Sequence, residues 1–259
     1  MKITEIITYS FIQGISEFLP ISSSAHLYAI QILYLIEIDG LTLALAAHLG
    51  TFLAVLLFEK KFIIENLNSL LLNNKENNLI MIFICVIPVI LLGILIIIFF
   101  KDLYKFTIPS IALASIVGAI LLDFSDNKKN TIKVKDKLSF KTSIFIGMFQ
   151  TLSLIPGMSR SGTVITAARY FGYSRFFSIK LALLTSIPII FLSSLYGLYE
   201  VFLTNNQINY DFFYIAFITF ICAYFSIKFL LKWVQYFSFR IFVIYRILFG
   251  TFLILVALF

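Results

Sequence analysis

Charged residues are scarce in this sequence. Asp, Glu, Lys and Arg make up 13% of its 259 residues, whereas hydrophobic residues make up 61%. A soluble globular domain carries roughly 25% charged residues, so this chain lacks the polar groups to cover a water-exposed surface. The shortage of charge excludes a cytosolic enzyme and a disordered tail, and it predicts that the chain lies in the lipid bilayer.

Cysteine is also rare. The two cysteines, Cys85 and Cys222, lie inside apolar runs, where they behave as small hydrophobic residues, and this excludes a secreted disulfide scaffold. The formal net charge of +7 does not indicate nucleic-acid binding, because the basic residues stand in short clusters between apolar runs and form no stripe. We therefore expect no nucleic-acid partner, and nothing in the sequence indicates an oligomeric state.

Six apolar segments are each long enough to cross a membrane as a helix. A helix rises about 1.5 Å per residue, so ~20 residues cross the ~30 Å of hydrocarbon in a bilayer. The six segments are residues 41–58, 79–100, 106–123, 178–198, 211–231 and 241–259.

Two further apolar regions are interrupted by polar and turn-forming residues. Residues 3–36 break at Leu-Pro-Ile-Ser-Ser-Ser, which begins at Leu19, and residues 141–172 break at Pro-Gly-Met-Ser-Arg-Ser-Gly, which begins at Pro156. Non-helical backbone at membrane depth is tolerated only where it is buried in protein or lines a watery cavity. Each region therefore predicts a re-entrant pair of half-helices joined by a loop. A signal peptide is disfavoured for the first region, because it contains glutamine and glutamate and no small-residue cleavage site follows.

The two interruptions are related by a constant shift of 137 positions. Adding 137 to Ser22 gives Ser159, and adding it to Ser24 gives Ser161. The same shift superposes the three spans of the first half on those of the second. Each half then holds three full crossings, and an odd number of crossings inverts the second half relative to the first.

The sequence thus predicts an all-α polytopic membrane protein built as an inverted repeat of two halves. Each half has one re-entrant helix pair and three transmembrane helices. We expect a single membrane domain over residues 1–259, in which the first repeat covers about 1–123 and the second about 141–259. A cytoplasmic linker over about 124–140 joins them.

The distribution of lysine and arginine predicts the orientation, because cytoplasmic loops carry an excess of both. The side that holds the two termini carries Lys2, Lys101 and Lys105. The opposite side carries Lys60, Lys61, Lys75, Lys128, Lys129, Lys133, Lys135, Lys137, Lys141, Arg169, Arg175, Lys180, Lys228, Lys232 and Arg240. This excess places the opposite side in the cytoplasm and both termini outside. The first loop then enters from outside and the second from inside, so their tips can meet.

Ionisable residues at membrane depth are costly and are by default a functional hypothesis. Glu17, His26 and Arg160 stand at or beside the interruptions. Gln13 and Glu17 are four residues apart and share one face of the first half-helix. The serines at 22–24 and His26 stand at the start of the next half-helix, whose N-terminus offers unpaired N–H groups.

The second loop repeats this polar pattern. Pro156 and Gly157 give a bend, Ser159 and Ser161 give hydroxyls, and Arg160 gives a permanent cation whose planar fork fits phosphate. Two helix N-termini, a row of hydroxyls and an arginine that converge inside the membrane predict a site for a buried anion, above all phosphate.

Such a site allows phosphoryl transfer, which needs a nucleophile, positive charge over the transferring oxygens and a proton donor for the leaving group. Ser23 is a candidate nucleophile with His26 as its base, and a neighbouring serine or a water molecule is an alternative. Arg160 would hold the phosphoryl group, and Glu17 would orient the histidine or bind a divalent cation.

Structural interpretations compete with these roles. Serines in membrane helices often only bond neighbouring helices, and Arg160 with Glu17 can form a purely structural ion pair. We assign His48, which lies inside a span, to helix packing. Arg246, which lies near the predicted cytoplasmic end of the last span, is expected to snorkel to the membrane surface.

Two long segments resemble the signatures of a known family. Residues 13–26, Gln-Gly-Ile-Ser-Glu-Phe-Leu-Pro-Ile-Ser-Ser-Ser-Ala-His, resemble the first motif of the undecaprenyl-diphosphatases, also called bacitracin resistance proteins. Residues 156–161, Pro-Gly-Met-Ser-Arg-Ser, resemble the second. The resemblance in length and span pattern extends over essentially the whole chain.

The resemblance implies an integral enzyme of the bacterial cytoplasmic membrane. Such an enzyme removes the terminal phosphate of undecaprenyl diphosphate, and its product is the lipid carrier reused in peptidoglycan synthesis. Overproduction protects against bacitracin, which sequesters the diphosphate. The resemblance also implies inverted repeats, an active site reached from the outer side of the membrane, and assistance by magnesium or calcium.

The family's functional positions can be carried over by motif. They fall on Gln13, Glu17, Ser22, Ser23, His26, Ser159, Arg160 and Ser161. We expect catalytic roles for Ser23, His26, Glu17 and Arg160. We expect phosphate binding by Ser22, Ser24, Ser159, Arg160, Ser161, Gly162 and Thr163. We expect metal binding, if any, by Glu17 and Gln13.

Two departures from the family pattern bear on these roles. Many relatives have glutamate where this chain has Gln13, which leaves one carboxylate fewer for a metal. The family often has threonine where this chain has Val164, and Thr163 stands one position early.

The competing function is a transporter or flippase for the lipid carrier, because inverted repeats with re-entrant loops are typical of transporters. Carrying a phosphate headgroup requires Arg160 but has no evident need for Ser23 and His26. A purely structural scaffold predicts that Arg160→Ala leaves phosphate release intact.

Overall fold

The computed structural model describes residues 3–34, 40–71, 78–100, 105–128, 138–203 and 209–258, and this part of the chain is helical throughout apart from short connections. The helices, with one short 3₁₀ helix η1, are α1 Ile3–Ser16, α2 Ser23–Tyr34, α3 Gly40–Leu71, α4 Asn78–Phe99, α5 Ile108–Asp126, α6 Phe140–Gln150, η1 Thr151–Leu154, α7 Arg160–Tyr170, α8 Arg175–Leu203, α9 Tyr210–Tyr236 and α10 Arg240–Leu258. Of the predicted linker, residues 129–137 lie outside the described residues.

Six of these helices are long and apolar enough to span a membrane, which confirms the six predicted spans. The six are α3, α4, α5, α8, α9 and α10. Helix α3 ends at Leu71 although the prediction ended at residue 58, because the polar residues after the apolar run remain helical and include an i,i+4 pair between Lys61 and Glu65. Large apolar side chains such as Phe99 of α4 and Phe217 of α9 are exposed, as expected of groups that contact lipid.

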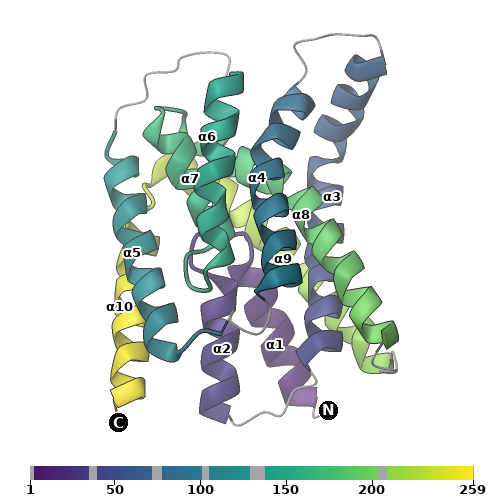
Figure 1. Cartoon of the computed structure of the whole chain (residues 1–259), viewed down its shortest axis with the longest axis vertical. Coiled ribbons are helices and arrows are strands. Elements are labelled where there is room, and N and C mark those ends of the chain that lie inside the picture. Colours follow the sequence, from purple (N-terminus) through teal and green to yellow (C-terminus); the bar gives the residue numbers. More distant parts are fainter. Residues whose placement is uncertain are drawn as a thin grey trace.

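The remaining helices form two pairs of short helices, and the break between the two helices of each pair lies at the predicted position. Helices α1 and α2 contain 14 and 12 residues, which span only about 21 and 18 Å at 1.5 Å per residue. Helices α6 and α7 contain 11 residues each. Figure 1 shows α1 and α2 at the end of the molecule that holds both termini, and α6 and α7 at the opposite end, with the two connecting loops meeting between them.

The packing of the two pairs follows one pattern. Helix α1 packs against α9, and α6 packs against α4. Helices α5 and α10 pack against each other along their length, and Figure 1 shows them side by side at one edge. Helix α3 packs between α8 and α9. The long spans therefore form a frame against which both short helix pairs pack, while one face of α1 and one of α6 stay exposed, as at Phe11 and Met148.

Close helix crossings in this frame depend on glycine. A Cβ atom at Gly50 of α3 would lie 2.4 Å from the carbonyl oxygen of Ala216 and 3.0 Å from the Thr219 Cβ, both in α9. Gly14 of α1 is similarly tight, since a Cβ there would lie 2.6 Å from the Cys222 Cβ. Small residues at such crossings let the backbones of membrane helices approach closely.

We predict that Gly50→Ala lowers the free energy of unfolding by about 1–3 kcal/mol, because the added methyl group overpacks the α3–α9 crossing. Reversible unfolding of the purified protein in mixed detergent micelles measures this change. Gly93→Ala is the matched control, since the nearest atom to a Cβ at Gly93 of α4 is 3.7 Å away. Equal stability of the two variants would contradict the prediction.

Candidate functional site

The backbone takes the same unusual conformation in both loops. Ser22 has a φ of 71° and Ser159 a φ of 69°, in the left-handed region that residues other than glycine rarely adopt. Each of these serines directly precedes a helix, and each makes the same side-chain contact. The Ser22 and Ser24 hydroxyl oxygens lie 3.1 Å apart, and those of Ser159 and Ser161 lie 3.2 Å apart. Strained backbone of this kind costs about 1–3 kcal/mol and is concentrated at functional sites.

The tips of the two loops bind each other directly. The Ser161 hydroxyl donates to the carbonyl oxygen of Leu19 at 3.0 Å. The Gly157 N–H donates to the Ser24 hydroxyl at 3.4 Å. The N-termini of α2 and α7 therefore lie next to each other in the interior of the helix bundle, as the sequence predicts for an anion site.

A buried ion pair joins the loops at Glu17. Its Oε1 accepts a hydrogen bond from Arg160 Nη2 at 2.7 Å, and the two side chains are only 8% and 12% exposed. Its Oε2 accepts from the Ser23 hydroxyl at 2.8 Å and from Gln13 Nε2 at 3.0 Å. The carboxylate thus gathers a cation, a hydroxyl and an amide from both halves of the sequence.

A cavity of about 170 Å³ opens beside this ion pair. It is lined by Glu17, Ser22, Ser23, Ser24, His48, Ser153, Ser159 and Arg160. Hydroxyls and a guanidinium dominate this lining, and such groups suit a phosphate. Most of the residues predicted for the site are therefore brought together, although they come from segments some 140 residues apart in the sequence.

His48 of α3 is a site residue that sequence reasoning missed. The sequence analysis assigned it to helix packing, but it lines the cavity. Its Nδ1 is buried and has no hydrogen-bond partner within the described part of the chain. The residues around His48 are almost all apolar, so the sequence does not indicate which face of the helix points into the protein.

His26 makes different contacts from those predicted. Its Nδ1 lies 2.7 Å from the carbonyl oxygen of Ser22 and its Nε2 lies 2.6 Å from the Tyr245 hydroxyl. Its ring stacks on Phe249, with 4.2 Å between ring centroids. Because a carbonyl only accepts, Nδ1 carries a proton, and in the neutral ring Nε2 accepts from the tyrosine. The structure therefore pairs Ser23 with Glu17 and His26 with Tyr245.

Two predicted phosphate ligands are engaged within their own helix. The Gly162 N–H donates to the Ser159 hydroxyl at 3.2 Å, which caps α7. The Thr163 hydroxyl donates to the carbonyl oxygen of Arg160 at 2.8 Å. The first turn of α7 thus fixes the Gly162 backbone and the Thr163 side chain, and neither residue is part of the cavity lining.

The donors for a divalent cation are few. Among the described residues, no group of three His, Cys, Asp or Glu side chains is arranged to hold a metal ion. Gln13 Oε1 is buried without a hydrogen-bond partner in this part of the chain, and its amide adjoins the Glu17 carboxylate. Magnesium is commonly held by one or two carboxylates together with substrate phosphates. These two residues fit a cation only in the company of bound phosphate.

The prediction for Arg246 was wrong. Its side chain is fully buried rather than extended to the membrane surface. Its Nη2 donates to the carbonyl oxygens of Gly157 at 2.9 Å and Met158 at 3.1 Å, and its Nη1 donates to that of Pro20 at 3.4 Å. The physical reason is that these non-helical carbonyls need donors at membrane depth, and Arg246 supplies them.

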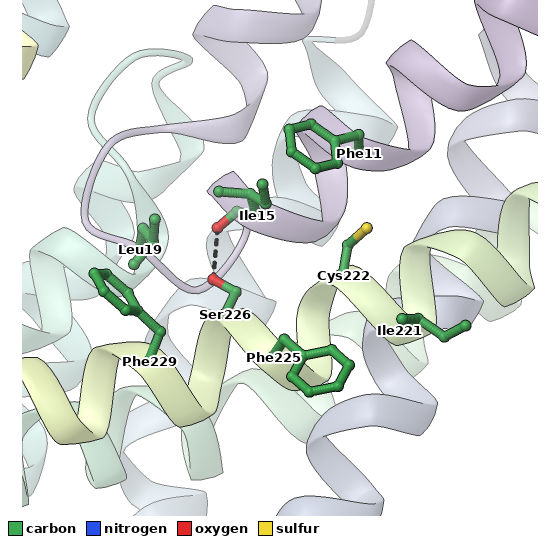
Figure 2. Close-up of a pocket in the computed structure, with 8 residues that line it drawn as sticks. All are labelled: Phe11, Ile15, Leu19, Ile221, Cys222, Phe225, Ser226 and Phe229. Carbon is green, nitrogen blue, oxygen red and sulfur yellow. Dashed lines mark hydrogen bonds between the residues drawn. The ribbon is translucent and has the colours of Figure 1, made fainter.

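A larger, apolar groove lies between α1 and α9. Its volume is about 460 Å³, and it is lined by Phe11, Ile15, Leu19, Ile221, Cys222, Phe225, Ser226 and Phe229. Figure 2 shows the α1 side chains facing those of α9, with the Ser226 hydroxyl turned to the carbonyl oxygen of Ile15, to which it donates at 2.9 Å. The groove offers hydrocarbon surface beside the first loop, because Leu19 of that loop is among its lining residues.

Comparison with known proteins matches the whole chain to one family. A family model described as "Bacitracin resistance protein BacA" matches residues 6–252. An undecaprenyl-diphosphatase of Pelagibacter ubique is 36% identical over 256 residues, which cover 98% of this chain and 98% of the relative. Undecaprenyl-diphosphatases of Aliivibrio salmonicida and Campylobacter curvus are 35% and 34% identical, over 97% and 99% of both chains.

We predict that Glu17→Gln lowers the free energy of unfolding by about 3–5 kcal/mol, because it leaves the Arg160 cation buried without a counter-charge. Glu65→Gln is the matched control: it breaks the exposed pair with Lys61, in which the nitrogen–oxygen distance is 3.9 Å. That change is expected to cost about 0.5 kcal/mol or less. Unfolding in mixed micelles measures both, and equal costs would show that the Glu17–Arg160 pair is not effectively buried.

Proposed function

Since the chain belongs to the bacitracin resistance protein BacA family, we propose that it hydrolyses undecaprenyl diphosphate to undecaprenyl phosphate and inorganic phosphate. The observation that carries this proposal is the meeting of the buried Arg160–Glu17 ion pair and the loop serines around one cavity. Through this reaction the protein recycles the lipid carrier for peptidoglycan synthesis and confers resistance to bacitracin. It is a multi-pass membrane protein of a bacterial family.

The proposed architecture is an inverted repeat within one membrane domain, with repeats of about 1–123 and 141–259. Three observations support it. The matched serines Ser22 and Ser159 share a positive φ, the paired hydroxyl contacts recur in both loops, and the packing of α1 on α9 parallels that of α6 on α4. The lysine and arginine distribution supports an orientation in the cytoplasmic membrane with the termini and the opening of the site on the outer side.

The proposed reaction begins with attack on the terminal phosphorus. The Ser23 oxygen forms a bond to phosphorus, its proton passes to Glu17 Oε2, and the bridging P–O bond breaks to release undecaprenyl phosphate. Water then hydrolyses the phosphoserine and releases inorganic phosphate. The 2.8 Å hydrogen bond from Ser23 to Glu17 supports this proton transfer. Direct attack by a water molecule held at Glu17 is the alternative.

Binding and orientation of the diphosphate fall to the cationic and hydroxyl groups. Arg160 holds the transferring phosphoryl group bidentately, and Ser22, Ser24 and Ser159 donate hydrogen bonds to it beside the helix N-termini, while Ser161 keeps its bond to the Leu19 carbonyl oxygen. His26, which is hydrogen-bonded to Tyr245, would in its protonated form give one proton to the leaving oxygen and become neutral. A magnesium or calcium ion held by Glu17, Gln13 and the substrate would neutralise phosphate charge.

The hydrocarbon chain of the substrate needs no polar site. The apolar groove of Figure 2 includes Leu19, two residues beyond Glu17, and offers that chain a surface between α1 and α9. Only the headgroup then has to enter the cavity.

A flippase for the lipid carrier is the second candidate, which the paired interruptions favour because such repeats are typical of transporters.

We predict that the purified protein releases phosphate from undecaprenyl diphosphate in detergent. Arg160→Ala should lower kcat by about 10²–10³-fold through loss of charge stabilisation, and His26→Ala and Ser23→Ala should lower it comparably. Colorimetric phosphate release, with and without magnesium or calcium, measures these effects. A soluble diphosphate should be hydrolysed far more slowly than the lipid.

Ser193→Ala and Arg240→Ala are the controls, because Ser193 only bonds its own helix and Arg240 is exposed. Both should match wild type. Activity that survives in Ser23→Ala would assign the attack to a water molecule. A folded wild-type protein that binds the lipid but releases no phosphate under any condition would reject the phosphatase and favour the flippase.

We also predict that Tyr245→Phe lowers kcat by about tenfold with little change in KM, because it removes the hydrogen bond that holds His26 Nε2. Tyr236→Phe, at an exposed tyrosine of α9, is the control and should match wild type. Measurement of kcat and KM for both variants tests this prediction. An unchanged kcat in Tyr245→Phe would show that the tyrosine hydroxyl contributes only to packing.

A further inference from the structure

Arg246 holds the two loops together from a helix that belongs to neither. It lies on α10, six residues after the helix begins, and its guanidinium reaches the carbonyl oxygen of Pro20 in the first loop and those of Gly157 and Met158 in the second. A single planar group therefore fixes the distance between the loops. A guanidinium has several donors in a rigid fork, so it is suited to several acceptors at once.

The charge of Arg246 is not balanced in the way that the other buried arginines are. Arg160 pairs with Glu17 at 2.7 Å, and Arg169 pairs with Asp126 at 3.1 Å. Within the described residues, no carboxylate lies within 4.0 Å of the Arg246 nitrogens, and Nε has no hydrogen-bond partner. A fully buried cation supported only by carbonyl dipoles is costly, which indicates that its position serves the site.

The guanidinium also lies close to the start of α7. A Cβ atom at Gly162 would lie 3.2 Å from Arg246 Nη1 and 3.1 Å from the Ser159 hydroxyl. The cation therefore adds to the positive end of α7, where Ser159 and Ser161 face the first loop. It does so from behind the loops, because it is not among the residues that line the cavity.

We propose that Arg246 is a positioning residue that sets the two serine loops, and with them Ser23 and Arg160, at the separation needed for phosphoryl transfer. This inference rests on the proposed phosphatase function. The bonds from Arg246 to the loop carbonyls hold the two loop tips in register. Its charge, which has no carboxylate partner among the described residues, adds to the positive potential at the bound diphosphate without direct contact. A misplacement of about 1 Å in a reacting group can cost about 10²-fold in rate.

Gly118 of α5 offers an independent way to move this guanidinium. A Cβ atom at Gly118 would lie 2.3 Å from Arg246 Nη2 and 3.1 Å from the carbonyl oxygen of Met158. Gly118→Ala therefore pushes on the guanidinium while its charge and all its donors remain. In a protein that carries Arg246→Met, the same alanine meets no guanidinium. Only its 3.1 Å approach to the Met158 carbonyl oxygen remains, so most of its effect on kcat should be lost.

The test is a double-mutant cycle on kcat and KM for undecaprenyl diphosphate, in protein shown to be folded by its melting profile. We expect Arg246→Met to lower kcat about 100-fold while KM changes less than about threefold. Arg246→Lys keeps the charge but lacks the fork, and should lose about tenfold. Gly118→Ala should also lose about tenfold, and the double variant Gly118→Ala/Arg246→Met should lie within about threefold of Arg246→Met alone.

Arg169→Met is the matched control, because it removes a buried arginine that lies outside the site. It should lower the melting temperature but keep kcat within about threefold. An equal fall of kcat in Arg169→Met, a normal kcat in Arg246→Met, or additive losses in the double variant would each overturn the proposal. A folded wild type without phosphatase activity would instead reject the proposed function, so the two failures are distinguishable.

Discussion

Non-helical backbone at membrane depth must find its hydrogen-bond partners inside the protein, and this constraint determines where the site lies. The residues between α1 and α2, and those between η1 and α7, have no helix ladder of their own. The loops therefore bond each other, through Ser161 to the Leu19 carbonyl and through the Gly157 N–H to Ser24. Arg246 supplies donors to both. The same contacts that satisfy the backbone groups of the two loops also bring two helix N-termini and a row of hydroxyls together.

The buried Arg160 guanidinium needs a counter-charge, and Glu17 supplies it. Its pairing with Arg160 stabilises both charges in a region of low dielectric. Under the proposed function, an incoming phosphate offers Arg160 a second anionic partner. Glu17 then has an oxygen that is less engaged, while it still accepts the Ser23 hydrogen bond. Binding of the anion would thereby raise the tendency of Glu17 to take the serine proton, which links binding to activation of the nucleophile.

The sequence predicted the parts of this structure that depend on hydropathy and on local motifs. Long apolar runs gave the six spans, and the interruptions at Leu19 and Pro156 gave both loops, because polar backbone is excluded from lipid. The sequence did not indicate the contacts of His48 and Tyr245, and its prediction for Arg246 was wrong; all three lie within uninterrupted spans. Hydropathy does not report which way a helix is rotated, and that rotation is set by contacts such as Gly250 against the Ala112 carbonyl of α5. A depth of six residues, or about 9 Å, was the available signal that Arg246 lies too deep to snorkel easily.

The pairing of Ser23 and His26 shows how a short sequence distance can mislead. The two are three residues apart at the start of α2, yet their hydrogen bonds point in different directions. Ser23 is the first residue of the helix and turns back to Glu17, whereas the His26 ring is held against α10 by Phe249 and Tyr245. The result is two separate hydrogen-bonded pairs, Ser23 with Glu17 and His26 with Tyr245, which under the proposed function would serve the attacking and the leaving oxygen. Cleavage of a phosphoric anhydride gains from a base for the attacking group and an acid for the leaving group. Separate proton partners serve that chemistry better than one histidine shared by both steps.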